Sequence, residues 1–176
     1  MNASQRRWIT LAAAIVIVIA GSLTIRACVG NTEPPIKIGS GESKQLGDVK
    51  WQVVSVLKTQ EIGAADSGLK AKDWFMVVDL YLTNGAEEKI AFDPATVSLV
   101  DGKDKEYSLN KQATDKQLKI QANPKTASMF SGTIEPKQSK RLVGVYDIPQ
   151  TATTMRLRVS GKAYGSDKDL EIALGF

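Results

Sequence analysis

The chain has 176 residues with 23 Lys or Arg and 19 Asp or Glu, one cysteine (Cys28) and no histidine. Without histidine, Ser-His-Asp and Cys-His catalysis and His-ligated zinc are excluded, and we predict no enzyme activity, no metal and no cofactor. Arg6, Arg7 and Arg26 supply three of the four net positive charges, so the remainder is nearly neutral and offers no basic face for nucleic acid.

Residues 1–28 are predicted to be an N-terminal membrane anchor or signal segment. An uncharged apolar run extends from Trp8 to Ile25, and as a helix of about 27 Å it matches the hydrocarbon core of a bilayer. The preceding arginines favour an N-terminus inside the cell and the rest of the chain outside. The side chains expected to contact lipid are Trp8, Leu11, Ile15, Ile17, Ile19, Leu23 and Ile25.

Three fates of this segment stay open. The first is an uncleaved single-pass transmembrane helix. The second is lipidation at Cys28, because Ile25-Arg26-Ala27-Cys28 resembles a lipoprotein signal, although the charge of Arg26 departs from that pattern. The third is cleavage after Ala27 and secretion. In each case the folded part lies outside the cytoplasm, and we expect a single-pass protein of the cell membrane, with a lipid-anchored or secreted protein as the alternatives.

The chain after the anchor divides into a linker and one domain. Residues 29–43 are rich in Pro, Gly and Ser and are predicted to be a linker. Residues 44–176 are predicted to be an extracytoplasmic domain without disulfides, since no cysteine follows Cys28. Its apolar side chains recur with the period of two that is typical of half-buried strands. The clearest of these segments are 49–53, 74–82, 97–99, 142–146, 155–159 and 170–174.

Seven or eight such strands predict an all-β, two-sheet sandwich. The strand from Trp74 is apolar on both faces, so we place it centrally, and Trp51 and Trp74 are expected in the core. Residues 111–125 are polar and poorly periodic, and a long loop and a short helix around Thr114–Ile120 both fit them.

The order of several short segments resembles a known family. Gly47-Asp48-Val49-Lys50-Trp51 opens the domain, Phe75-Met76-Val77-Val78-Asp79 follows a small-residue loop, and Val143-Gly144-Val145-Tyr146-Asp147-Ile148-Pro149 comes near the end. This order resembles DUF4352, a family of exported bacterial domains whose immunoglobulin-like sandwich is similar to that of a mycobacterial immunoprotective secreted antigen. The resemblance covers residues 39–176. It implies an immunoglobulin-like, surface-anchored domain, mostly of Gram-positive bacteria, and no catalytic residues.

One local basic cluster is a candidate site. If the last strands pair, a patch for phosphate or carboxylate groups of envelope polymers or lipid headgroups would form on their outward side. The alternative is that these charges keep the sheet soluble and block edge pairing. The cluster consists of Lys140, Arg141, Arg156, Arg158 and Lys162.

The sequence therefore predicts a membrane-tethered binding module of the bacterial cell envelope whose partner is another protein or an envelope polymer. One alternative is a lipoprotein or secreted sandwich with a structural role in an envelope or export complex. Another is an enzyme or metal-binding module that uses carboxylates alone. The acidic loop from Asp101 to Glu106 fits a hairpin turn better than a calcium loop, because two lysines interrupt it.

Overall fold

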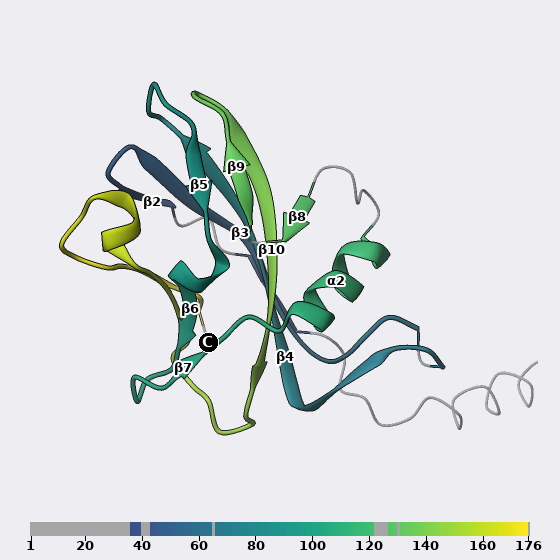
Figure 1. The fold of residues 1–176 in the computed structure, drawn as a ribbon. Coiled ribbons are helices and arrows are strands. Elements are labelled where there is room, and N and C mark those ends of the chain that lie inside the picture. The colour runs from purple at the N-terminus through teal and green to yellow at the C-terminus, as the bar shows by residue number, and fades with distance from the viewer. Residues whose placement is uncertain (1–35, 40–42, 65, 122–126, 130, 176) are drawn as a thin grey trace, which may run out of the picture. The chain divides into compact units, whose positions relative to one another are not determined.

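A computed structural model describes residues 36–39, 43–64, 66–121, 127–129 and 131–175 (Figure 1). The chain divides into two compact units, residues 1–33 and 34–176. The predicted anchor at 1–28, with Cys28, lies outside the described residues. Among the helices that the structure does describe, none has the length and apolar character needed to cross a bilayer.

A six-stranded sheet forms one layer of the second unit. Its order is β1-β3-β4-β10-β8, and β2 pairs with the first half of β3. All pairs are antiparallel except that of β10 with β8. The strands are β1 (Ile36–Gly39), β2 (Ser43–Leu46), β3 (Val49–Ile62), β4 (Leu69–Asn84), β8 (Ala127–Met129) and β10 (Ser139–Ile148).

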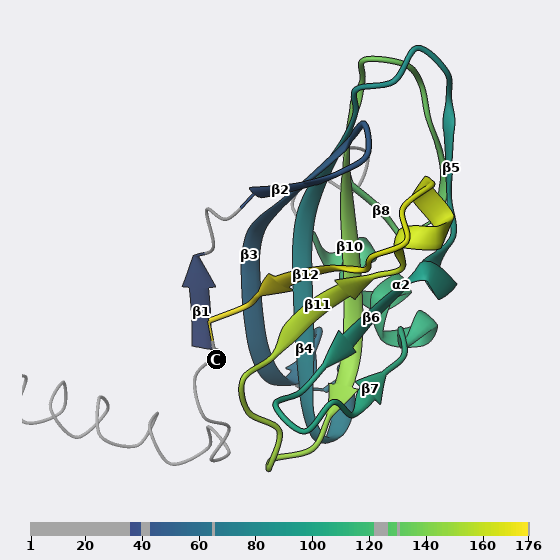
Figure 2. The same cartoon turned by 90° about the vertical axis from the view of Figure 1, so that its left-hand side faces the viewer.

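A four-stranded antiparallel sheet forms the other layer, in the order β12-β11-β6-β7. Figure 2 shows this sheet lying across the long strands β3, β4 and β10. Its strands are β6 (Val97–Val100), β7 (Glu106–Tyr107), β11 (Arg156–Val159) and β12 (Leu170–Ala173). At the margin of the layers, Lys44 Nζ of β2 donates a hydrogen bond of 2.8 Å to the Glu171 carbonyl oxygen of β12.

The remaining elements are short. Strands β5 (Ile90–Phe92) and β9 (Gly132–Ile134) form a separate two-stranded ribbon. A 3-10 turn, η2 (Pro94–Thr96), leads into β6, and a second, η3 (Gly161–Tyr164), follows β11. The one α-helix in the described part of the chain is α2 (Lys111–Ile120).

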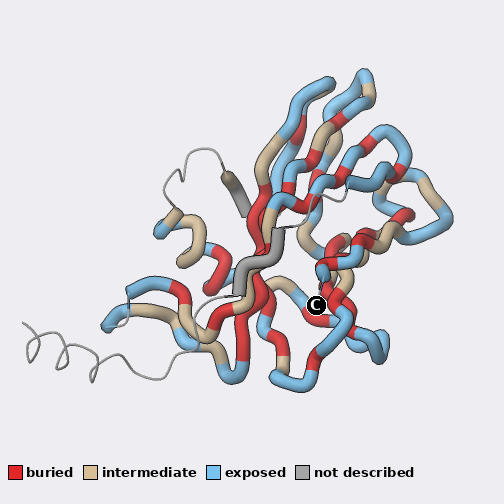
Figure 3. Tube along the Cα trace, turned by 180° about the vertical axis from the view of Figure 1, so that it is seen from behind, coloured by how far each residue is buried: buried red, intermediate tan, exposed pale blue. Residues whose placement is uncertain are grey.

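The core has two parts because β4 is apolar on both faces. Met76, Val78 and Leu80 point into the cluster between the two sheets, which also contains Trp51. Phe75 lies in a second cluster, on the opposite face of the six-stranded sheet. Ala113 of α2 belongs to this second cluster, so the helix covers that face, and buried residues run along the middle of both layers (Figure 3).

The structure confirms the all-β sandwich, the central place of β4 and the buried tryptophans, since Trp51 and Trp74 are 0% and 6% exposed. The expected seven or eight strands are wrong, because the described residues form twelve. Several of the added strands have only two to four residues, too few to display a period. Within residues 29–43, which the sequence predicts to be a linker, Ile36–Gly39 pairs with β3 as β1.

The helical alternative for the polar stretch is correct over Lys111–Ile120. The Asn110 side chain caps α2 by accepting a hydrogen bond of 2.9 Å from Ala113 N. Within the helix, Ala113 and Thr114 are buried. A single turn of small buried residues is too weak an apolar pattern to reveal a helix in sequence.

Candidate functional site

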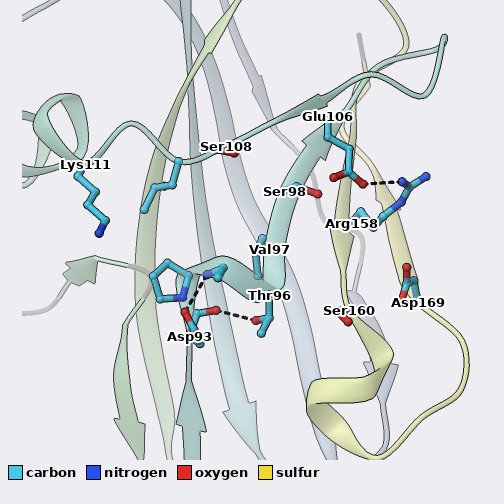
Figure 4. A pocket seen from close by; sticks show the side chains of 13 residues that line it. Asp93, Thr96, Val97, Ser98, Glu106, Ser108, Lys111, Arg158, Ser160 and Asp169 are labelled. Carbon is cyan, nitrogen blue, oxygen red and sulfur yellow. Dashed lines mark hydrogen bonds and ion pairs between the residues drawn. The ribbon is translucent and has the colours of Figure 1, made fainter.

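A hollow of about 530 Å³ opens beside the four-stranded sheet and is the candidate site (Figure 4). Its wall is built from β6, β7, β11, the turn η2 and the start of α2. Thirteen residues line it: Asp93, Pro94, Ala95, Thr96, Val97, Ser98, Glu106, Ser108, Leu109, Lys111, Arg158, Ser160 and Asp169.

Two carboxylates at the hollow are positioned by the short turns that they cap. Asp93 Oδ1 accepts a hydrogen bond of 2.9 Å from Ala95 N at the start of η2. Asp169 Oδ1 accepts one of 3.0 Å from Gly161 N at the start of η3. Gly161 is required there, because a Cβ would lie 2.1 Å from the Lys168 carbonyl oxygen. Each carboxylate therefore uses one oxygen for the fold and presents the other to the surroundings.

The two cations of the hollow, Arg158 and Lys111, differ in whether they pair with carboxylates of the protein. Arg158 donates from Nε and Nη2 to Glu171 Oε1, at 2.9 and 2.7 Å, and from Nη1 to Glu106 Oε1 at 2.9 Å. The hydrogen bond to Glu171 is the main reason that the pKa of Arg158 is raised. Lys111, exposed at the first position of α2, makes no ion pair within the described residues.

Hydroxyl groups complete the polar wall. Ser98, Ser108 and Ser160 line the hollow from β6, from the segment after β7 and from the end of β11. In the described part of the chain none of the three side chains has a hydrogen-bond partner. Pro94 and the half-buried Leu109 add apolar surface. The arrangement offers donors, acceptors and a little apolar surface together, which is what a binding site for a polar ligand needs.

The predicted basic cluster is divided between the two sheets. Arg156 and Arg158 lie on the outer face of β11, whereas Lys140 and Arg141 belong to β10 in the six-stranded sheet. Lys162 is exposed in η3. The five residues therefore do not form one patch, because β10 and β11 lie in different sheets. Anion binding by any of them stays a prediction.

Each arginine of the cluster has a carboxylate partner. Arg156 Nη2 lies 2.7 Å from Asp104 Oδ1, and Glu171 accepts from Arg158 while its other oxygen lies 3.5 Å from Arg156 Nε. With Glu106 included, three carboxylates surround two guanidinium groups on this face. The partners come from the β6–β7 hairpin and from β12, which the arginine spacing alone could not reveal.

Arg141 is paired on the other sheet. Its Nε donates to both carboxylate oxygens of buried Asp79, at 2.9 and 3.1 Å, and Nη2 also contacts Asp79 Oδ2. The hydrogen bond to Asp79 is the main cause of the raised pKa of Arg141. This bidentate pair crosses from β10 to β4 beside the face that α2 covers.

The acidic loop after β6 is a hairpin turn. Asp101 Oδ1 accepts hydrogen bonds from Lys103 N and Lys105 N, and Oδ2 accepts one of 2.8 Å from the Tyr107 hydroxyl. The Tyr107 bond is the main reason that the pKa of Asp101 is lowered, while burial, followed by Asp101, raises the pKa of Tyr107 to about 12. Among the described residues, no group of His, Cys, Asp or Glu is arranged to hold a metal ion.

Sequence reasoning missed the residues that line the hollow, apart from Arg158. The signal for Asp93 is present, since Asp-Pro-Ala-Thr is a typical cap before a short turn. Lys111, Ser98 and Asp169 carry no such signal, because only the pairing of the strands brings them together.

The fold and the hollow define a class: an all-β sandwich domain with a polar surface site. Within that class the chain belongs to the DUF4352 family. The family model, described as "Domain of unknown function (DUF4352)", matches residues 38–170. No curated protein matches the chain significantly.

Solved structures share the fold. A conserved hypothetical protein from Bacillus anthracis is 19% identical with a TM-score of 0.60, and the match covers 80% of this chain and 98% of that one. The yjhA protein from Bacillus subtilis is 16% identical with a TM-score of 0.55, covering 77% and 98%. A Bacillus subtilis protein named as a candidate lipoprotein, ycdA, is 13% identical with a TM-score of 0.53, covering 76% and 38%.

Proposed function

We propose that this chain is a binding module of the bacterial cell envelope, held at the membrane by residues 1–28 with the sandwich outside the cytoplasm. Its partner is a protein or an envelope polymer. The observation that carries the proposal is the hollow, where Lys111 and three serine hydroxyls face the opening without partners in the described part of the chain. Unoccupied donors gathered around the hollow, on β6 and on the segments beside the sheet, favour binding of a polar partner.

Two observations support the envelope location: one from the sequence and one from the structural comparison. The apolar run from Trp8 to Ile25, preceded by two arginines, favours a single span with the N-terminus inside. The structural similarity to ycdA, named as a candidate lipoprotein, fits a lipid anchor at Cys28 as the alternative. We also propose that the sandwich is immunoglobulin-like, as the resemblance to this family implies.

We propose binding rather than catalysis for this site. Asp93 and Asp169 are both explained by the turns that they cap. Glu106 is explained by its ion pair with Arg158. None of the three carboxylates therefore needs a catalytic role to account for its position.

Site-specific photo-crosslinking in intact cells tests the binding role. A photoreactive residue replacing exposed Ser108, at the hollow, is expected to crosslink to an envelope component. The same residue replacing Asp73, exposed on β4 away from the hollow, is the matched control. Equal labelling at both positions, or none at either, would contradict a binding role for the hollow.

The location has its own test. Protease added to intact cells is expected to digest the sandwich, and the intact mass of the purified protein distinguishes the full chain, a chain diacylated at Cys28 and one trimmed after Ala27. A sandwich that is protected until the cells are opened would place it in the cytoplasm and contradict the proposal.

A further inference from the structure

We infer that the hollow beside β6 and β7 binds an uncharged or amine-bearing saccharide rather than an anionic polymer. This inference rests on the proposed function, because it names the ligand class of the same site. The sequence predicts that the basic cluster binds anions. The inferred ligand is different because Arg158, the member of that cluster at the hollow, is already paired with carboxylates of the protein.

The cations of the hollow leave little for an anion to bind. Arg158 is held by Glu106 and Glu171 through three hydrogen bonds of 2.7–2.9 Å. A phosphate at this site would have to displace one of these carboxylates, losing charge-assisted bonds as it gained them. Of the described lining residues, Lys111 alone carries a positive charge without an ion pair.

The acceptors, in contrast, are in excess. Asp93, Glu106 and Asp169 each use one carboxylate oxygen within the fold, through Oδ1, Oε1 and Oδ1. The second oxygen of each has no hydrogen-bond partner among the described residues. Such a wall favours a ligand that donates hydrogen bonds, and sugar hydroxyl and amino groups do so.

The acceptors are also spread out. The described Asp and Glu side chains form no group of three close enough to hold a metal ion, and Figure 4 shows Asp93 apart from Glu106 and Asp169. Spaced acceptors suit an extended ligand with several hydroxyl groups better than a single ion.

The size and the remaining lining fit the same ligand. A volume of about 530 Å³ lies within the range of about 300–1,000 Å³ that small-molecule sites occupy. Pro94 and Leu109 offer apolar surface for the C–H faces of a sugar ring, while Ser98, Ser108 and Ser160 both donate and accept hydrogen bonds.

Isothermal titration of the full chain in detergent micelles tests the ligand class. Three probes are compared: the uncharged tetramer of N-acetylglucosamine, its de-acetylated, amine-bearing form, and poly(glycerol phosphate). We expect at least one of the two saccharides to bind and poly(glycerol phosphate) not to bind.

The variants D93N and D169N sharpen the test. Asparagine keeps the oxygen that caps the turn but replaces the second acceptor with a donor, so each variant is expected to weaken saccharide binding about tenfold. D73N, which changes an exposed carboxylate away from the hollow, is the matched control and is expected to bind normally. Ser108→Trp, which fills the opening, is expected to abolish binding, and circular dichroism melting verifies that all variants fold.

The possible results separate the two proposals. Binding of poly(glycerol phosphate) that Lys111→Gln abolishes and D93N leaves intact would overturn the saccharide assignment. Saccharide binding that D93N, D169N and Ser108→Trp all leave unchanged would overturn it as well. Failure of both saccharides to bind, with crosslinking at Ser108 retained, would also overturn it while the binding module stands. Loss of saccharide binding and of crosslinking together would overturn both.

Discussion

Arg141 belongs to the basic cluster that the sequence predicts to bind anions, but in the structure it pairs with Asp79. Asp79 is only 5% exposed, and a carboxylate so buried needs a partner. Arg141 supplies it with a bidentate contact across β4 and β10. The charge of Arg141 is thereby compensated inside the protein.

Removing Arg141 is therefore expected to destabilise the protein. The variant Arg141→Met leaves Asp79 buried and unpaired, and we expect a loss of about 3 kcal/mol in the free energy of unfolding, measured with urea. Arg156→Met is the matched control, because Asp104, its closest partner, is 74% exposed, and this variant is expected to cost less than about 1 kcal/mol. Equal losses would show that the Asp79 pair has no special weight.

The start of helix α2 hydrogen-bonds to the edge of β10 beyond the point where β8 ends. β8 pairs only with Arg141, Leu142 and Val143 of β10. Beyond it, Val145 N donates a bond of 3.0 Å to Thr114 Oγ1, and Asn110 N donates one of 2.8 Å to the Val145 carbonyl oxygen. The start of the helix thus satisfies a strand edge that would otherwise be buried without partners.

Thr114→Val tests this contact at nearly constant side-chain volume. It removes the acceptor of Val145 N and leaves that amide buried, so we expect the free energy of unfolding to fall by about 2 kcal/mol. Amide exchange at Val145 is expected to speed up as well. Thr151→Val, at an exposed turn position, serves as the control. Unchanged exchange at Val145 in T114V would contradict the role given to the helix.

At the scale of the molecule, two apolar clusters form the core of the sandwich, and the domain folds without disulfides. One lies between the sheets and the other between the six-stranded sheet and α2, and no cysteine follows Cys28. Residues 34–176 form a compact unit of their own. A chain of this size buries about two-thirds of its unfolded surface, which supports folding without covalent crosslinks.

We therefore expect a fragment of residues 34–176 to unfold in a single thermal transition that reductant does not shift. Differential scanning calorimetry with and without dithiothreitol measures it, and the full chain in micelles, which retains Cys28, is the comparison. Separate transitions for the two clusters, or a fragment that does not fold, would contradict this account.

Long strands are the elements that the sequence predicts best, because they show the alternation of apolar side chains over many residues. β4 alternates over enough residues to place it centrally, and its two apolar faces foreshadow both clusters. Strands such as β7, with two residues, show no period and escape notice. The hollow is not predictable for a different reason: Asp93, Lys111 and Asp169 are far apart in the chain, and only strand order brings them to one wall.

The hydrogen bond from Lys44 to Glu171 bears on how the protein behaves at high concentration. β12 is the last strand of its sheet, and such a strand exposes carbonyl groups to which a strand of another molecule can pair. Lys44 Nζ already occupies the Glu171 carbonyl oxygen. A neighbouring molecule would have to displace this charged side chain to extend the sheet, so the contact opposes fibre-like assembly of the protein at high concentration.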